Sequence, residues 1–217
     1  MAIKASGGGG DFEKVPAGAH FAICDKVVYL GMQRTTFDGR EKILPKVWLG
    51  FQIPDIQHEY EKDGKKLSGP AVIGRKFTLN IGDNSNLGPF LKNWRGRAFT
   101  DDEVNNGYDV EKLAGKPCQL GVIHEKSKDG GKTYANITSA GALMKDTIDA
   151  IRAGTRKAEP HGKVLVYNAD EHDQAVYDQL PEFLRKQIDQ RVKPGDGKKA
   201  AKPSETSTDD FNDDIPF

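Results

Sequence analysis

The sequence has few of the features that mark a secreted, membrane or disulfide-bonded protein. Only two of its 217 residues are cysteines, Cys24 and Cys118, which is too few for a disulfide scaffold. No apolar run approaches the roughly 18 residues that a transmembrane helix requires, and residues 1–14 contain no apolar segment of the kind found in signal peptides. These absences predict a cytoplasmic protein with no membrane partner.

Net charge is also lacking, but the charges are unevenly distributed. The chain holds 32 Lys and Arg against 32 Asp and Glu. Five of the carboxylates, and no Lys or Arg, fall in residues 205–217, which leaves residues 1–204 with 32 basic and 27 acidic side chains. A mildly basic body with an acidic tail is a charge asymmetry found in nucleic-acid-binding proteins.

Motifs of catalysis and metal binding are scarce. The Gly-Lys-Thr sequence at 131–133 resembles the end of a phosphate-binding loop, but the glycine required at position 126 is Lys126. Cys24, Cys118 and the histidines lack the paired spacing of metal ligands, so we expect buried structural cysteines. The sequence therefore predicts neither an enzyme nor a metal or cofactor site.

The composition divides the chain into four segments. Residues 1–15 contain four consecutive glycines and are expected to form a flexible leader, because glycine loses the most conformational freedom on ordering. Residues 16–143 form the main domain, and residues 144–192 a mostly helical extension. Residues 193–217 are expected to be a disordered linker and an acidic tip, because the linker lacks large apolar side chains.

The main domain contains five predicted strands, at residues 18–33, 43–53, 71–81, 117–125 and 132–140. Alternation is clearest in the second, where Val47, Leu49, Phe51 and Ile53 share one face. We read residues 54–70 as a protruding loop or small hairpin.

Helical signals separate the third and fourth strands. Residues 86–94 have a helical pattern, and Thr100 and Glu103 form a capping box. Three strands, a helical segment and a two-strand hairpin are the element order of an OB-fold. The predicted class is mainly β: a five-stranded OB-like barrel with a helical insertion, a helical C-terminal extension and a disordered acidic tail. The alternative is an unrelated small antiparallel α+β sheet.

The outward faces of three predicted strands carry a cation or polar group, in two cases together with an aromatic ring, and single-stranded nucleic acid binding needs this combination. Cations neutralise phosphates, and rings stack on unpaired bases. The candidate DNA-binding residues are Lys46, Trp48, Lys76, Thr78, Lys92, Trp94, Arg95, Arg97, Lys126, Lys128, Lys132, Tyr134 and Asn136. Two alternatives stay open: residues 54–70 bury Trp48, and Trp94 packs its helix against the barrel.

The last nine residues combine an acidic tract with an apolar tip. Aspartates attract a basic surface at long range, and a terminal carboxylate beside an apolar tip suits capture in a pocket. The candidate partner-binding residues are Asp209, Asp210, Phe211, Asp213, Asp214, Ile215, Pro216 and Phe217. The opposite charges of body and tail also predict that an empty DNA groove holds the tail in cis.

The ending Asp-Asp-Phe-Asn-Asp-Asp-Ile-Pro-Phe closely resembles the acidic C-terminal tip of bacterial single-stranded DNA-binding proteins. In that family the tip recruits enzymes of DNA replication, recombination and repair. Residues 77–103 and 115–137 resemble a bacteriophage or prophage OB-fold protein of the same functional class, and this similarity spans about 16–143. The resemblance implies sequence-independent binding and protection of single-stranded DNA in the cytoplasm of a bacterial host cell. The extension at 144–192 is unfamiliar, and we expect it either to form a homodimer or to cover one side of the barrel.

Two other classes of function remain open. The first is a protein-recruiting adaptor whose barrel does not bind DNA. The second is a phage recombination enzyme, either a nuclease or a strand-annealing protein. Binding to RNA is a further alternative, because stacking on rings does not sense the 2′-hydroxyl group.

Overall fold

The computed structural model describes residues 14–37, 40–62, 65–127 and 130–193. The strands are β1 (Gly18–Phe37), β2 (Arg40–Lys62), β3 (Lys65–Thr78), β4 (Pro117–Lys126), β5 (Thr133–Gly141) and β6 (Leu165–Asn168). The helices are α1 (Leu87–Arg95), α2 (Asp101–Asn106), the 3-10 helix η1 (Val110–Leu113), α3 (Lys145–Arg152), α4 (Gln174–Tyr177) and α5 (Glu182–Asp189). The protein is mainly β, as predicted, with helices after β3 and after β5.

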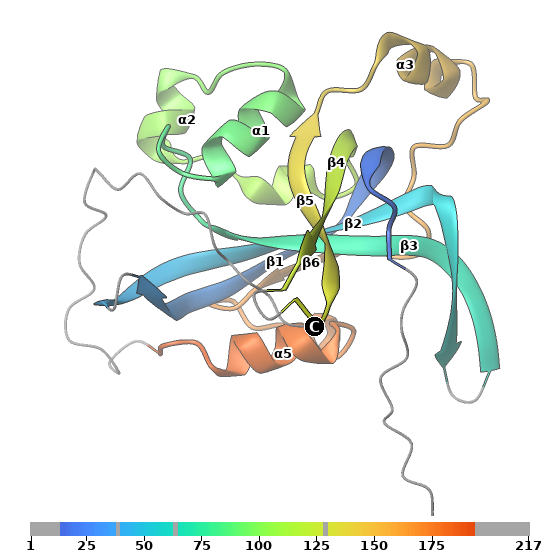
Figure 1. Ribbon diagram of the computed structural model, residues 1–217. Coiled ribbons are helices and arrows are strands. Elements are labelled where there is room, and N and C mark those ends of the chain that lie inside the picture. Colours follow the sequence, from blue (N-terminus) through green and yellow to red (C-terminus); the bar gives the residue numbers. More distant parts are fainter. Residues whose placement is uncertain (1–13, 38–39, 63–64, 128–129, 194–217) are drawn as a thin grey trace, which may run out of the picture.

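Five strands form a curled antiparallel sheet in the order β3-β2-β1-β4-β5 (Figure 1). Its two edge strands, β3 and β5, approach each other. Arg75 Nη1 of β3 donates hydrogen bonds to the carbonyl oxygens of Ile137 (3.0 Å) and Thr138 (3.4 Å) of β5. The predicted order of three strands, helices and a hairpin is confirmed. The sheet therefore has the shape of a half-barrel whose edges are linked through a side chain.

A sixth strand joins this sheet from a segment that we expected to be mostly helical. β6 pairs in parallel with Lys26 to Tyr29 of β1. A strand of four residues is too short to show an alternating pattern in the sequence. Its pairing with β1 is a tertiary contact that the sequence pattern did not reveal.

The inner face of the curled sheet holds the main hydrophobic core. Val47, Leu49, Phe51 and Ile53 are fully buried there, so the predicted inward face of β2 is confirmed. Helix α1 covers one end of this core, where the ring of Trp94 lies 5.5 Å from that of Phe51, centroid to centroid.

A second apolar core lies on the opposite face of β1 and β2, beneath α5. Its buried members are Val28, Leu30, Trp48, Leu165, Tyr167, Ala169, Leu180, Leu184 and Ile188. Helices α1 and α2 lie on one side of the sheet and α5 on the other (Figure 1). Of the two roles expected for the extension, the covering of one side is the one seen within this chain.

The end of the extension is tied back to β1 by hydrogen bonds. The Val192 amide donates to the Met32 carbonyl oxygen (2.7 Å), and Gln33 Nε2 donates to the Gln187 carbonyl oxygen (3.0 Å). Pro181 stands at the start of α5, where proline is well tolerated because a helix does not need that amide. The extension and the sheet are thus one packed unit.

Local predictions about the connections also hold. The segment expected as a loop or small hairpin is a hairpin that continues β2 and β3, with Gln57 opposite Pro70. The capping box at α2 is present: Thr100 Oγ1 accepts from the Glu103 amide (3.2 Å), and Glu103 Oε2 accepts from the Thr100 amide (2.9 Å). Short-range chemistry sets both features.

The predicted leader and tail fall mainly outside the described residues, and this includes the whole acidic tip at 209–217. The last leader residue, Val15, is buried, and its carbonyl oxygen lies 2.8 Å from His124 Nε2. The chain is therefore anchored to β4 from this position. None of the helices in the described part is both long and apolar enough to cross a membrane.

Candidate nucleic-acid interface

The structure separates the candidate DNA-binding residues of the strands into two groups. We call the outer face of β1 and β2 beneath α5 the covered face, and it includes Lys46 and Trp48. We call the outer face of the β4–β5 hairpin the open face, and it includes Ile123, Tyr134 and Asn136. The two faces offer very different access to a ligand.

Trp48 belongs to the covered face and is only 3% exposed. Its ring meets Phe183 of α5 in an edge-to-face contact, with centroids 5.2 Å apart. On its other side the ring lies against Gly74 of β3, where a Cβ atom would come within 2.3 Å of the indole. The predicted stacking of a base on Trp48 is therefore wrong for this structure. The ring is buried, although α5 covers it rather than residues 54–70.

Lys46 lies beside Trp48 and is also buried. Its Nζ atom donates a hydrogen bond to Thr78 Oγ1 of β3 (2.8 Å), which offsets part of the cost of burying an ammonium group. Lys46 and Thr78 therefore bond to each other at this position. Lys76 is the partner of Trp48 in the β2–β3 register and is half-buried, so it lies at the border of the covered face.

The predicted cluster around the end of α1 is tied into local ion pairs. Lys92 pairs with Asp83, and Arg95 Nη2 donates to Glu103 Oε1 at 2.5 Å. Trp94 is buried, and its Nε1 atom donates to the Pro117 carbonyl oxygen (2.9 Å). The alternative role of Trp94, packing α1 against the sheet, is confirmed, and we withdraw stacking on this ring.

Arg95 acts as a brace between α1 and α2. Its guanidinium group lies 4.6 Å from the ring centroids of both Phe99 and Tyr108. Its hydrogen bond, together with the Thr100 amide, lowers the pKa of Glu103 to about 2. Glu103 therefore stays ionised and also faces Arg97 at 3.6 Å. Of the two arginines that contact Glu103, Arg97 is exposed. Arg95 is mostly buried and links α1 to α2.

The open face brings together the remaining sequence-predicted side chains. Tyr134 lies opposite Glu125, and Asn136 lies opposite Ile123. Tyr134 and Asn136 are half-buried, and Asn136 Nδ2 donates to Glu125. Ile123 is exposed beside them. The result is a small apolar and aromatic surface with fixed polar groups, of a kind on which an unpaired base can lie.

Two cations stand at the tip of the same hairpin. Lys126 and Lys132 are exposed, and neither forms an ion pair with a carboxylate of the described ranges. The Ser127 amide donates to the Lys132 carbonyl oxygen (2.8 Å), and Ser127 Oγ accepts from the Lys132 amide (3.0 Å). These bonds fix the backbone of Lys132 at the end of the hairpin, where Lys126 lies opposite Thr133. Lys128 lies outside the described residues.

Sequence reasoning missed two features of this region. Arg75, which links β3 to β5, resembles any other strand cation in the sequence. Ile123 was not recognised as exposed. A usable signal existed for the covered face: Gly50 and Gly74 lie opposite each other within β2 and β3, and glycine inside a strand often marks the close approach of another group.

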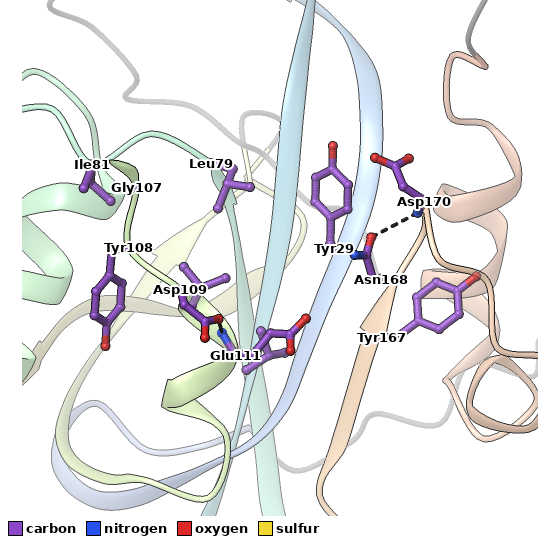
Figure 2. A pocket seen from close by; sticks show the side chains of 12 residues that line it. Tyr29, Leu79, Ile81, Gly107, Tyr108, Asp109, Glu111, Tyr167, Asn168 and Asp170 are labelled. Carbon is purple, nitrogen blue, oxygen red and sulfur yellow. Dashed lines mark hydrogen bonds between the residues drawn. The ribbon is translucent and has the colours of Figure 1, made fainter. Parts of the chain in front are cut away.

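A cavity lies between β1, β6 and η1, on the far side of the sheet from the β4–β5 hairpin's outer residues that form the open face, and Tyr167 of the second core reaches it (Figure 2). Its volume is about 390 Å³, and three tyrosines line it together with three carboxylates: Tyr29, Tyr108 and Tyr167, and Asp109, Glu111 and Asp170. Burial and the nearby Asp170 raise the pKa of Tyr29. No Lys or Arg is among the lining residues. This cavity therefore repels phosphate groups and lies outside the candidate DNA path.

The two cysteines are free and buried in the main core. Burial raises the pKa of both thiols, which keeps them protonated and unreactive. Across the described ranges, no three His, Cys, Asp or Glu side chains are grouped so that they could hold a metal ion.

Comparison of the chain with models of protein families and with curated proteins gave no match.

Proposed function

We propose that this protein binds single-stranded DNA through an OB-like barrel and recruits partner proteins through its acidic tip. The strand order β3-β2-β1-β4-β5, with β3 brought to β5 at Arg75, is the observation that carries the proposal. This is the order of the five-stranded Greek-key barrel that binds oligonucleotides. The helices between β3 and β4 stand where that fold places its helix.

The proposed DNA path runs over the open face and the edge of β3. Tyr134 and Ile123 would receive bases, while Lys126 and Lys132 would neutralise phosphates. Lys76 extends the path on β3, and Asn136 contributes a polar edge. The covered face takes no part, because α5 and β6 occupy it.

The partner-binding part of the proposal rests on the sequence of the tip at 209–217. Its aspartates and terminal Ile-Pro-Phe would engage a basic, apolar pocket on a protein of DNA replication, recombination or repair. Binding of the strand would free the tip if the tail occupies the DNA path in its absence. The proposed role needs no cofactor and no catalytic step.

The test is a salt titration of binding to labelled oligo-dT and to a duplex of equal length. It uses the full chain and a truncation at residue 208. We expect tight binding to the single strand only, with a steep loss of affinity as salt rises, and tighter binding by the truncation at low salt. Absence of binding by both proteins would overturn the DNA-binding proposal and favour an adaptor. Equal affinity of the two proteins would overturn only the competition by the tail.

A further inference from the structure

The cavity between β1, β6 and η1 has no part in the proposed function. Four aliphatic side chains line it beside the three tyrosines: Val27, Leu79, Ile81 and Val110. Its volume of about 390 Å³ falls in the range of sites that hold small ligands. The cavity is therefore large enough to take up a long side chain from another segment.

The charged groups that line the cavity are all negative. Asp109 and Glu111 stand on the η1 side, and Asp170 follows β6 on the other side (Figure 2). Asp109 Oδ2 lies 3.8 Å from Lys112 Nζ. Glu111 and Asp170 form no ion pair with a cation of the described ranges. The faces of tyrosine rings attract cations as well, so the cavity favours a positively charged group.

An organic cation suits this cavity better than a metal ion. A calcium or magnesium ion needs several oxygen ligands that converge on one point, and in the described part of the chain no three His, Cys, Asp or Glu side chains are grouped in this way. The apolar stem of a lysine can lie along aliphatic and aromatic walls while its ammonium group remains in water. The carboxylates of Glu111 and Asp170 are exposed, so they can meet that group at the rim.

The described part of the chain ends close to this cavity. The Val192 amide donates to the Met32 carbonyl oxygen of β1 (2.7 Å). Met32 lies three positions after Tyr29, which corresponds to about 10 Å along a strand. The Ala169 amide, next to Asp170, donates to the Tyr29 carbonyl oxygen (3.1 Å). The chain therefore leaves β1 beside the wall that carries Tyr29 and Asp170.

The next positions of the sequence supply lysines within reach of the cavity. Lys198, Lys199 and Lys202 follow Lys193 at five, six and nine positions, with Asp196 as the one carboxylate among residues 194–202. A chain of five residues spans at most about 17 Å and on average about 12 Å. A tether of this length gives an effective concentration in the millimolar range, so a contact that is weak between separate molecules can form within the chain.

We propose that this cavity binds lysine side chains of residues 198–202 of the same chain, with their ammonium groups beside Glu111 and Asp170. The contact anchors the start of the tail next to β1. Only the residues after 202 then extend from the body with the partner-binding tip. The inference goes beyond the proposed function and does not depend on it, because no residue of the proposed DNA path lines the cavity.

The first test is treatment of the full chain with a carbodiimide, which joins an amine to a carboxyl group that it contacts. Mass spectrometry of the peptides identifies the joined pairs. We expect Lys198, Lys199 or Lys202 joined to Glu111 or Asp170 in the monomer band of a denaturing gel. Absence of these pairs from the monomer band would overturn the inference, whether the lysines are joined to other carboxylates or to a second copy of the chain.

The second test measures the rate at which trypsin cleaves after Lys198 and Lys199. A lysine held in the cavity cannot enter the protease. We therefore expect the double variant Glu111→Gln, Asp170→Asn to be cleaved at these positions at least about threefold faster than the unaltered protein at low salt, because it loses the charge that attracts the lysines. Cleavage after Lys4, near the other end of the chain, is the internal reference.

The matched control removes two exposed carboxylates that do not line the cavity. It is the double variant Asp146→Asn, Glu159→Gln, which changes the net charge by the same amount and should leave the cleavage rate unaltered. All four carboxylates are exposed, so both variants should fold, and thermal denaturation verifies this. Equal rates in the two double variants would contradict the proposal.

These results are independent of DNA binding. A protein that binds no single strand would lose the proposed function, yet it should still show the cross-links to the cavity. A protein that binds oligo-dT but lacks those cross-links would lose only the inference about the cavity.

Discussion

The covered face and the open face belong to the same curled sheet, and both carry an aromatic ring beside a lysine. On the covered face, Trp48 packs against Phe183, and the ammonium group of Lys46 bonds to Thr78. On the open face, Tyr134 is half-buried beside the exposed Lys132. A ring and a cation on an outward strand face therefore indicate binding only if no later segment of the chain packs over them.

The segment that makes the difference lies more than a hundred positions further along the chain. α5 contributes Leu184 and Ile188 to the covered face, and β6 contributes Leu165 and Tyr167. Burial of such side chains stabilises a fold by about 1.5–3 kcal/mol each. No comparable apolar segment of the described chain lies over the β4–β5 hairpin, so that face keeps its access to solvent.

The largest expected effect is a loss of folding stability on substitution of Trp48, and it tests whether the covered face is part of the hydrophobic core. Trp48→Ala should lower the free energy of unfolding by about 3–5 kcal/mol, because it leaves a large cavity beneath α5. Urea denaturation followed by circular dichroism measures this change. Tyr134→Ala, on the open face, is the control and should cost less than about 1 kcal/mol. Equal losses in the two variants would contradict the distinction between the faces.

The next effect concerns DNA affinity on the open face. Tyr134→Ala should weaken binding to oligo-dT by about 1–3 kcal/mol, because a stacked ring is lost. Tyr134→Phe keeps the ring and should bind nearly as well as the unaltered protein. Fluorescence anisotropy at fixed salt measures both. If Tyr134→Phe is as weak as Tyr134→Ala, the hydroxyl group rather than stacking accounts for the contribution.

The smallest expected effect is a change in the salt dependence of DNA binding. It distinguishes a cation of the open face from a cation on α5. Lys132→Ala should reduce the slope of log affinity against log salt concentration by about 0.7, the value for one phosphate contact with a single strand. Lys186→Ala is the matched control, because Lys186 is an exposed cation on α5 that pairs with Glu182. Its slope should remain unchanged. A similar change in both variants would mean that the strand also crosses α5.

Much of the fold could be predicted because its signals are local. The inward face of β2 follows from the alternation of Val47, Leu49, Phe51 and Ile53, and Thr100 and Glu103 mark the start of α2 by capping chemistry. The buried role of Trp94 was one of the two alternatives that its helical position allowed. These features depend on side chains only a few positions apart.

The binding residues were harder to predict because their exposure depends on distant partners. Lys46 and Gln52 look like solvent-facing polar residues, yet Thr78, Asp25 and the His161 backbone satisfy them inside the protein. Glu103 pairs with Arg95 from another helix. No pattern around these residues in the sequence names their partners.

The sequence by itself determined the predominantly β class, the order of its elements, the inward face of β2 and the helix caps, because periodicity and capping act over a few residues. The tertiary structure alone decided which outward face stays open, which cations are already paired and which carboxylates line one cavity. Those outcomes depend on the free energy of packing one segment against another that is distant in the chain. Sequence patterns that span a few residues do not show which distant segments pack against each other.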